Sequence, residues 1–285
     1  MRENSIALTY DKKYLQYDRP QPLTDNKIES LIQEVVSKNI NPDTTNQIYE
    51  DFKIELIDWI TSSKLNSITG FDSFNRTDIC IGCTQFIDTL YMNVPIQTIA
   101  GDYKYHERLN DAIQFSIIGN LKPKIPLIIA LPFPKIGDIH PSMDLILDEC
   151  LSKDIPVHID GAWVTCCRNI NFNLNHPSIE SAAISLSKGL GLGWNRIGLR
   201  WSKHKTPDAI TVMNDFHMNN RALVIIGLYF LRNLQPDHLW TTHKDRYEKI
   251  CKDFNLEQTN SIYIALKDKN PVGISPLIRY LENNG

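Results

Sequence analysis

The sequence has no long hydrophobic run. Its longest apolar stretch, residues 222–231 between Arg221 and Arg232, is far shorter than the ~20 residues that a membrane-spanning helix needs. The N-terminus has no apolar segment behind its basic residues, so we expect no signal peptide. These absences indicate a protein with no membrane partner that works in the cytoplasm.

Cysteine and net charge are also scarce. Six cysteines among 285 residues are too few for a disulfide scaffold and indicate a reducing compartment. Cys80-x-x-Cys83 has a metal-type spacing, but the second pair, Cys166-Cys167, does not, so zinc is the less favoured interpretation. The 30 basic and 33 acidic residues give a net charge of −3. That balance argues against nucleic-acid binding, which needs clustered positive charge.

Three common catalytic motifs are missing. No Gly-x-Ser-x-Gly elbow is present, which argues against a serine hydrolase of that type. The turn at Gly82 does not continue as Gly-Lys-Ser/Thr, so a P-loop nucleotidase is not expected. Gly189-x-Gly191-x-Gly193 has the wrong spacing for a dinucleotide-binding loop.

What the chain does have is a regular alternation of short apolar runs and amphipathic segments. We expect strands at Asp78–Ile81, Ile96–Ala100, Pro126–Leu131, Pro156–Asp160, Ala182–Ser185 and, near the end, Ser261–Leu266. We expect helices at Asp25–Lys38, Tyr49–Ser62, 82–93, His106–Ile118, Ser142–Ser152, Asn219–Asn233, Thr241–Asp253 and Pro276–Glu282. Continuous apolar strands between helices favour an α/β protein whose mostly parallel central sheet is covered on both faces.

The pattern also suggests three parts. Residues 1–24 are polar and irregular and form an N-terminal arm. Residues 25–240 form the large α/β domain, and residues 241–285 form a reduced C-terminal small domain.

The segment from Ser181 to Ser202 is the most informative for chemistry. Lys188 follows a strand and two serines, Ser185 and Ser187, and precedes a glycine-rich turn and Arg196. A lysine held on a rigid turn can be desolvated, which lowers its pKa and makes it a nucleophile for carbonyl groups. An arginine and two hydroxyls nearby can bind a phosphate. The alternative interpretation is an ordinary glycine-rich loop with a solvated lysine.

Two further segments belong to the same edge of the expected sheet. Asp160 ends an apolar strand, where a carboxylate needs a partner such as a protonated pyridine nitrogen. His158 lies on the same strand face and either orients Asp160 or is a core histidine. Gly82-Cys83-Thr84 is a strand-to-helix turn whose free N–H groups can bind phosphate, although an ordinary helix start has the same pattern.

Together these segments resemble the fold type I pyridoxal-phosphate (PLP) enzymes, and most closely the class I/II aminotransferases. The family signature is Ser-x-x-Lys, with Arg eight residues after the lysine and Gly two residues later. Ser185, Lys188, Arg196 and Gly198 match it position by position. The resemblance covers about residues 78–250 and implies a three-layer PLP-transferase-like fold with PLP bound to Lys188 as a Schiff base.

The resemblance also implies roles for the other residues. Asp160 would keep the pyridine nitrogen protonated. The family's Gly-x-Thr phosphate turn corresponds to Gly82-Cys83-Thr84. The aromatic residue that stacks on the cofactor ring corresponds to Tyr103, with Tyr105 as the reserve. The cofactor-binding residues implied are thus Gly82, Cys83, Thr84, Tyr103, Asp160, Trp163, Ser185, Ser187, Lys188 and Arg196.

The sequence departs from the family at three places. The usual Asn-Pro-x-Asn-Pro-x-Gly segment is here 131–137, LPFPKIG, without either asparagine. Trp163 stands where the family has a tyrosine that donates to the cofactor's 3′ oxygen; its indole N–H can also donate. Family members are longer and carry a small-domain arginine for the substrate carboxylate, whereas Arg279 is the only arginine after Arg246.

The resemblance implies an aminotransferase that uses a small-molecule amino donor and a keto acid acceptor and works as a homodimer. The lysine and aspartate segments also look like those of threonine aldolases and group II decarboxylases, so a PLP-dependent lyase is the alternative. A relic that binds the cofactor without turnover is a further alternative, although a relic would not need the lysine.

Overall fold

The computed structural model describes residues 15, 21–38, 45–92, 94–108, 114–116 and 118–284. The helices are α1 (Asn26–Ser37), α2 (Gln47–Thr61), α3 (Gly82–Tyr91), α4 (Lys104–Arg108), α5 (Met143–Ser152), α6 (Leu186–Gly189), α7 (Ala209–Asp215), α8 (Arg221–Asn233), α9 (His238–Phe254) and α10 (Ser275–Asn284). The strands of the main sheet are β2 (Arg76–Cys80), β3 (Gln97–Ile99), β4 (Gln114–Ser116), β5 (Leu127–Ala130), β6 (Val157–Gly161), β8 (Ile179–Ser185) and β9 (Gly198–Ser202).

The main sheet has the strand order β2-β9-β8-β6-β5-β3-β4. Strand β9 runs antiparallel to both of its neighbours, and the other pairings within the sheet are parallel. The central strands β5 and β6 are buried along their whole length, as strands covered on both faces must be. The mixed α/β fold with a mostly parallel central sheet is therefore confirmed.

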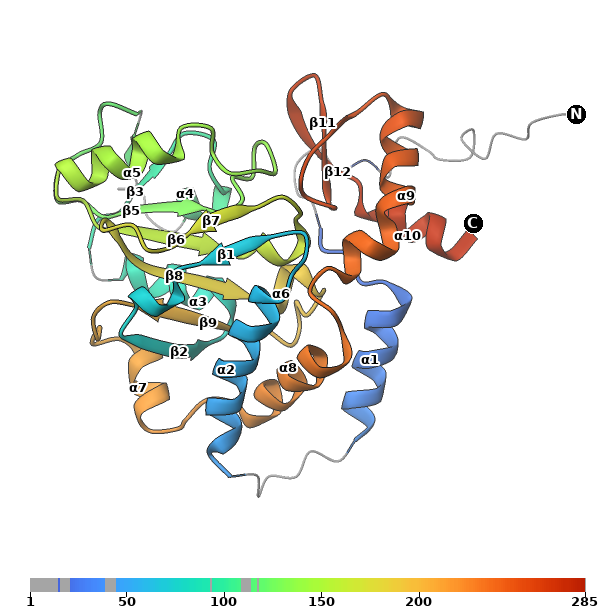
Figure 1. Ribbon diagram of the computed structural model, residues 1–285, viewed down its shortest axis with the longest axis horizontal. Helices are drawn as coiled ribbons and strands as arrows, with labels where there is room; N and C mark the ends of the chain where they lie inside the picture. The colour runs from blue at the N-terminus through green and yellow to red at the C-terminus, as the bar shows by residue number, and fades with distance from the viewer. Residues whose placement is uncertain are drawn as a thin grey trace, which may run out of the picture.

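Helices cover the two faces of this sheet and make three layers. On one face, Leu127, Ile159 and Trp201 belong to one apolar core with residues of α2, α5 and α8. On the other face, Ile128 and Ala183 pack with Phe86 and Ile87 of α3. Figure 1 shows α2 and α8 side by side beneath the strands. Packing on both faces holds the strands in place, and with them the loops at the strand ends where the site lies.

A smaller unit follows the main sheet in sequence. It consists of α9, α10 and an antiparallel sheet of β10 (Glu257–Gln258), β11 (Ile264–Lys267) and β12 (Asn270–Gly273). Figure 1 shows it beside the strand layers, with α1 next to it. A separate pair, β1 (Ser67–Thr69) and β7 (Asn171–Asn173), is parallel.

Three expectations about elements were wrong. The helix expected over His106–Ile118 ends at Arg108, and Gln114–Ser116 form β4 instead because they pair with β3. The strand expected at Ser261–Leu266 begins at Ile264, because Ser261 forms an isolated bridge with Cys167 and a turn follows it. Strand β9 was not expected, because it directly follows a glycine-rich segment. It forms by pairing with β2 on one side and β8 on the other. The arm expected over 1–24 lies mostly outside the described residues, which include only Leu15 and 21–24 of it.

Candidate active site

The candidate site lies where the parallel strands of the main sheet end. Asp160 is the last residue but one of the buried strand β6, and Lys188 is in the short helix α6 that follows β8, the neighbouring strand. The carboxyl ends of parallel strands share one edge of a sheet, which is the usual place for a ligand in such folds. The structure thus brings together the lysine and the carboxylate that the sequence singled out.

Lys188 is half-buried, and its surroundings disfavour the charged ammonium. Burial lowers the pKa of the Lys188 amine, and the nearby positive charge of Arg196 lowers it further. Asp160 lies close enough to oppose this in part. The Lys188 Nζ atom lies 5.5 Å from the centre of the Trp163 ring. A lysine in this environment is a better nucleophile than one in water.

Asp160 is buried and has a histidine partner. Its Oδ2 atom lies 3.1 Å from His106 Nε2, and its Oδ1 atom accepts a hydrogen bond from the Ala162 N–H. On its other side, His106 Nδ1 lies 3.5 Å from a carboxylate oxygen of Asp102. Burial alone would lower the pKa of His106, but Asp102 and Asp160 outweigh it and raise the pKa to about 9. The positive charge that this gives His106 lies next to the Asp160 carboxylate.

His106 was missed as a site residue in the sequence. It follows Tyr103 by three positions in the first turn of α4, and that spacing after a strand end is the signal that could have found it. His158, considered there as the orienting residue, instead contacts Ser181 Oγ at 2.7 Å. Burial lowers the pKa of His158 to about 4, so it is a neutral core histidine.

Ser187 and Arg196 come close to the backbone at the start of α3. Gly82 has φ = +67°, and a Cβ atom placed on it would lie 3.0 Å from Ser187 Oγ and 3.2 Å from Arg196 Nη2. The Ser187 hydroxyl is buried without a hydrogen-bond partner among the described residues. Arg196 donates to the Thr84 hydroxyl. A buried orphan hydroxyl, a guanidinium and free helix N–H groups are the donors that bind a phosphate.

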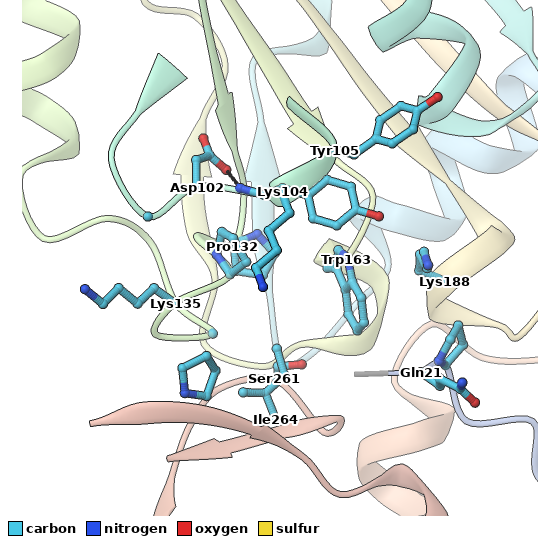
Figure 2. Close-up of a pocket in the computed structure, with 16 residues that line it drawn as sticks. Gln21, Asp102, Lys104, Tyr105, Pro132, Lys135, Trp163, Lys188, Ser261 and Ile264 are labelled. Atoms are coloured by element: carbon cyan, nitrogen blue, oxygen red, sulfur yellow. Dashed lines mark hydrogen bonds between the residues drawn. The ribbon is translucent and has the colours of Figure 1, made fainter. Parts of the chain in front are cut away.

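The remaining predicted residues divide into two groups. Tyr103 and Trp163 line a cavity of about 500 Å³ together with Lys188, and Figure 2 shows this hollow. Tyr105 also lines it, and its hydroxyl donates to Asp88. In contrast, the Cys83 thiol is buried against the carbonyl oxygen of Ala183, so only its backbone is available to a ligand.

Two other features bear on the alternatives considered for the sequence. All six cysteines are free and buried, and the one group of metal-ligating side chains found in the described residues contains no cysteine. No helix within the described ranges is long and apolar enough to cross a membrane.

Comparison with known structures identifies the fold. The chain has the fold of the aspartate aminotransferases. It superposes on the Thermotoga maritima enzyme with a TM-score of 0.62 and 11% identity, covering 94% of this chain and 89% of that one. A mutant of the Thermus thermophilus enzyme gives a TM-score of 0.61 and 11% identity, over 93% and 84% of the two chains.

A lyase has the same fold. The PLP-bound C-S lyase from Staphylococcus hominis superposes with a TM-score of 0.60 and 11% identity, covering 93% of this chain and 80% of that one. No protein-family model and no curated protein sequence matches the chain. The likeness is one of fold, and the PLP-transferase-like architecture expected from the sequence is confirmed.

Proposed function

We propose that this protein is a PLP-dependent aminotransferase that acts on an amino acid or a related small amine through Lys188. The observation that carries the proposal is the buried Ser187 hydroxyl, which has no hydrogen-bond partner in the described part of the chain. It lies beside Gly82 and Arg196, one residue before a lysine whose pKa is lowered. The fold neighbours include aminotransferases and a PLP-bound enzyme, which supports the same cofactor.

The residues present fit that cofactor. Ser187, Arg196 and the N–H groups at the start of α3 would hold the phosphate, and Thr84 supports Arg196 through its hydroxyl. Asp160 would face the ring nitrogen, with His106 in contact with its Oδ2 atom. Tyr103 and Trp163 form walls of the adjoining cavity, where an aromatic ring can stack between them or against one of them.

Each residue then has a chemical task. PLP, when bound, supplies an electron sink for the charge left on the substrate carbon. Lys188 would hold the cofactor through its amine and, once freed, move the proton at the carbon beside the substrate's amino group. Its lowered pKa suits this work, because an ammonium cannot accept a proton. Asp160 would pair with the ring nitrogen and so favour the protonated form of that nitrogen.

A PLP-dependent lyase is the second candidate, and the residues near the cofactor's 3′ oxygen are the observation that favours it. Pro134 and Trp163 line the cavity at the positions where the resembled aminotransferases have an asparagine and a tyrosine next to the cofactor's 3′ oxygen. One donor, the indole N–H, would replace two. A changed hydrogen-bond pattern at that oxygen alters the electronics of the cofactor, and the same fold carries a C-S lyase.

We also propose that the enzyme is a homodimer in the cytoplasm, as the resemblance implies. Six buried, free cysteines are consistent with a reducing compartment.

The first test is chemical trapping of the cofactor. PLP is added to the purified protein, the absorbance is recorded between about 320 and 450 nm, and borohydride is added. We expect a band that borohydride removes, and a mass increase that peptide mapping places on Lys188. The Lys188→Ala variant should show no such adduct, whereas Lys244→Ala, which changes an exposed lysine of α9, should keep it. A reducible adduct that survives in Lys188→Ala would remove the proposal.

Amino donors then separate the reactions. Conversion of the bound cofactor to its amine form, with release of a keto acid, indicates transamination. Release of carbon dioxide, an aldehyde or a thiol indicates a lyase. A band that no amine changes indicates the relic considered above.

A further inference from the structure

The wall of the cavity beside Lys188 is rich in positive charge. Lys104, Lys135 and Lys188 all line it, and Asp102 is the one carboxylate among the described lining residues. Asp102 is buried, and its oxygens accept hydrogen bonds from the N–H groups of Tyr103 and Ala130. The Asp102 carboxylate is therefore occupied by backbone donors.

The arginine that the sequence offers for a substrate carboxylate is occupied elsewhere. Arg279 binds Glu29 at 2.5 Å and Glu282 at 2.6 Å, and also donates to Asn26. It joins α10 to α1 and does not line the cavity. A carboxylate that enters the cavity must therefore find another cation.

Of the two cavity lysines other than Lys188, only Lys104 is placed to meet a ligand. Figure 2 shows its side chain reaching into the hollow between Pro132, Trp163 and Ser261, whereas the Lys135 side chain points away. The Lys135 stem lies against Gly101, with its Cδ 3.2 Å from a Cβ placed there. Lys104 is exposed, and within the described part of the chain its ammonium has no hydrogen-bond or ion-pair partner.

We propose that Lys104 binds the carboxylate of the substrate and so makes the enzyme selective for anionic amines. This inference rests on the proposed function. An ammonium on a flexible stem binds a carboxylate as a point charge, without the two parallel hydrogen bonds of an arginine. Lys104 directly follows Tyr103, so a carboxylate held there would lie next to the aromatic wall of the cofactor site and opposite Trp163.

The test measures carboxylate binding without turnover. Succinate carries carboxylates but no amine, and succinamide is its uncharged analogue. Calorimetric titration of the PLP-loaded enzyme should show succinate binding that weakens with added salt, and far weaker succinamide binding. Lys104→Gln should weaken succinate binding about 10-fold or more, because a charge-assisted hydrogen bond is lost. Lys104→Arg should retain it, and Lys135→Gln, the matched control, should change it less than about 2-fold.

Turnover supplies the second readout. In Lys104→Gln, KM for an α-amino acid substrate should rise while kcat stays close to that of the unchanged enzyme, as expected for lost uniform binding. Equal effects of Lys104→Gln and Lys135→Gln, or equal binding of succinate and succinamide, would overturn the assignment. Since the Lys188 adduct does not require Lys104, loss of the adduct would refute the proposed function, and an intact adduct with unaltered succinate binding would refute this inference alone.

Discussion

At the site, the charge of His106 depends on the side chains that surround it. His106 sits between two carboxylates, and the pair raises its pKa to about 9 despite full burial. The charge of His106 therefore depends on the two carboxylates beside it, Asp102 and Asp160.

Replacement of Gly82 tests most directly the phosphate site proposed at Ser187 and Arg196. Gly82→Ala puts a methyl group 3.0 Å from Ser187 Oγ and 3.2 Å from Arg196 Nη2, on a backbone with positive φ. We expect the affinity for PLP to fall by about 10-fold to 100-fold, because at least one charge-assisted contact is displaced. The measurement is a titration of the apoprotein with PLP, followed by absorbance.

A glycine in the turn that follows Lys188 provides the control for this change. A methyl group added at Gly193 would meet only open space, so Gly193→Ala should leave the affinity for PLP unchanged. If Gly82→Ala bound PLP as tightly as the unchanged protein, the phosphate would have to lie elsewhere.

At the scale of helices and strands, the sequence predicts what depends on neighbours along the chain. The apolar runs that became β5, β6 and β8 are continuous and buried, so their pattern is local and visible. Strand β4 is different, because a three-residue segment becomes a strand only by pairing with β3. Such pairing depends on residues distant in sequence, which a periodicity cannot report.

The residues of the site also divide into those that a local sequence pattern predicts and those that only the fold brings together. Lys188 and Arg196 belong to a motif with fixed spacing, and Asp160 lies near the end of a visible apolar strand, so their proximity could be predicted. His106 and Lys104 act through positions in space: one reaches Asp160 over 54 residues of sequence, and the other lines a cavity together with residues of the smaller unit. His106 follows Tyr103 by three positions, but no spacing rule links His106 to Asp160 or Lys104 to the smaller unit.

The contact between α2 and α8 gives a prediction at this scale. A Cβ atom on Gly227 of α8 would lie 2.6 Å from the Phe52 ring of α2, which is fully buried. Gly227→Ala should therefore lower the free energy of unfolding by about 1–3 kcal/mol, although alanine is the better helix former at an open position. Urea denaturation measures the change.

A second substitution isolates the cause. Phe52→Leu reduces the ring that the new methyl group would meet, so the double variant should lose less stability than the sum of the two single changes. Simple additivity of the two losses, or a Gly227→Ala variant more stable than the unchanged protein, would contradict the close packing of these helices.

Over the whole molecule, segments from the two ends of the chain are joined at one buried carboxylate. Asp25 Oδ1 accepts a hydrogen bond from the Ile28 N–H and caps α1, while Oδ2 lies 2.6 Å from His238 Nε2 and 2.9 Å from His243 Nε2. Both histidines belong to α9. Gln21, four residues before Asp25, lines the cavity, so this cluster also anchors part of the site's wall.

The charge of Asp25 gives the last prediction, which concerns stability and pH. Burial alone would raise the pKa of Asp25, but hydrogen bonds from His238 and His243 outweigh it and hold the pKa well below the usual 3.8. A carboxylate with a lowered pKa stabilises the fold above about pH 4 and loses that contribution as the pH falls through and below that value. Asp25→Ala should lower the free energy of unfolding at pH 7 by about 3–5 kcal/mol. Asp25→Asn, which can still cap α1, should cost less, and both variants should lose less stability than the unchanged protein between pH 6 and pH 3. Urea denaturation across that range is the measurement, with Asp245→Asn, an exposed site on α9, as the control. An unchanged acid dependence in Asp25→Ala would show that this carboxylate does not hold the two ends of the chain together.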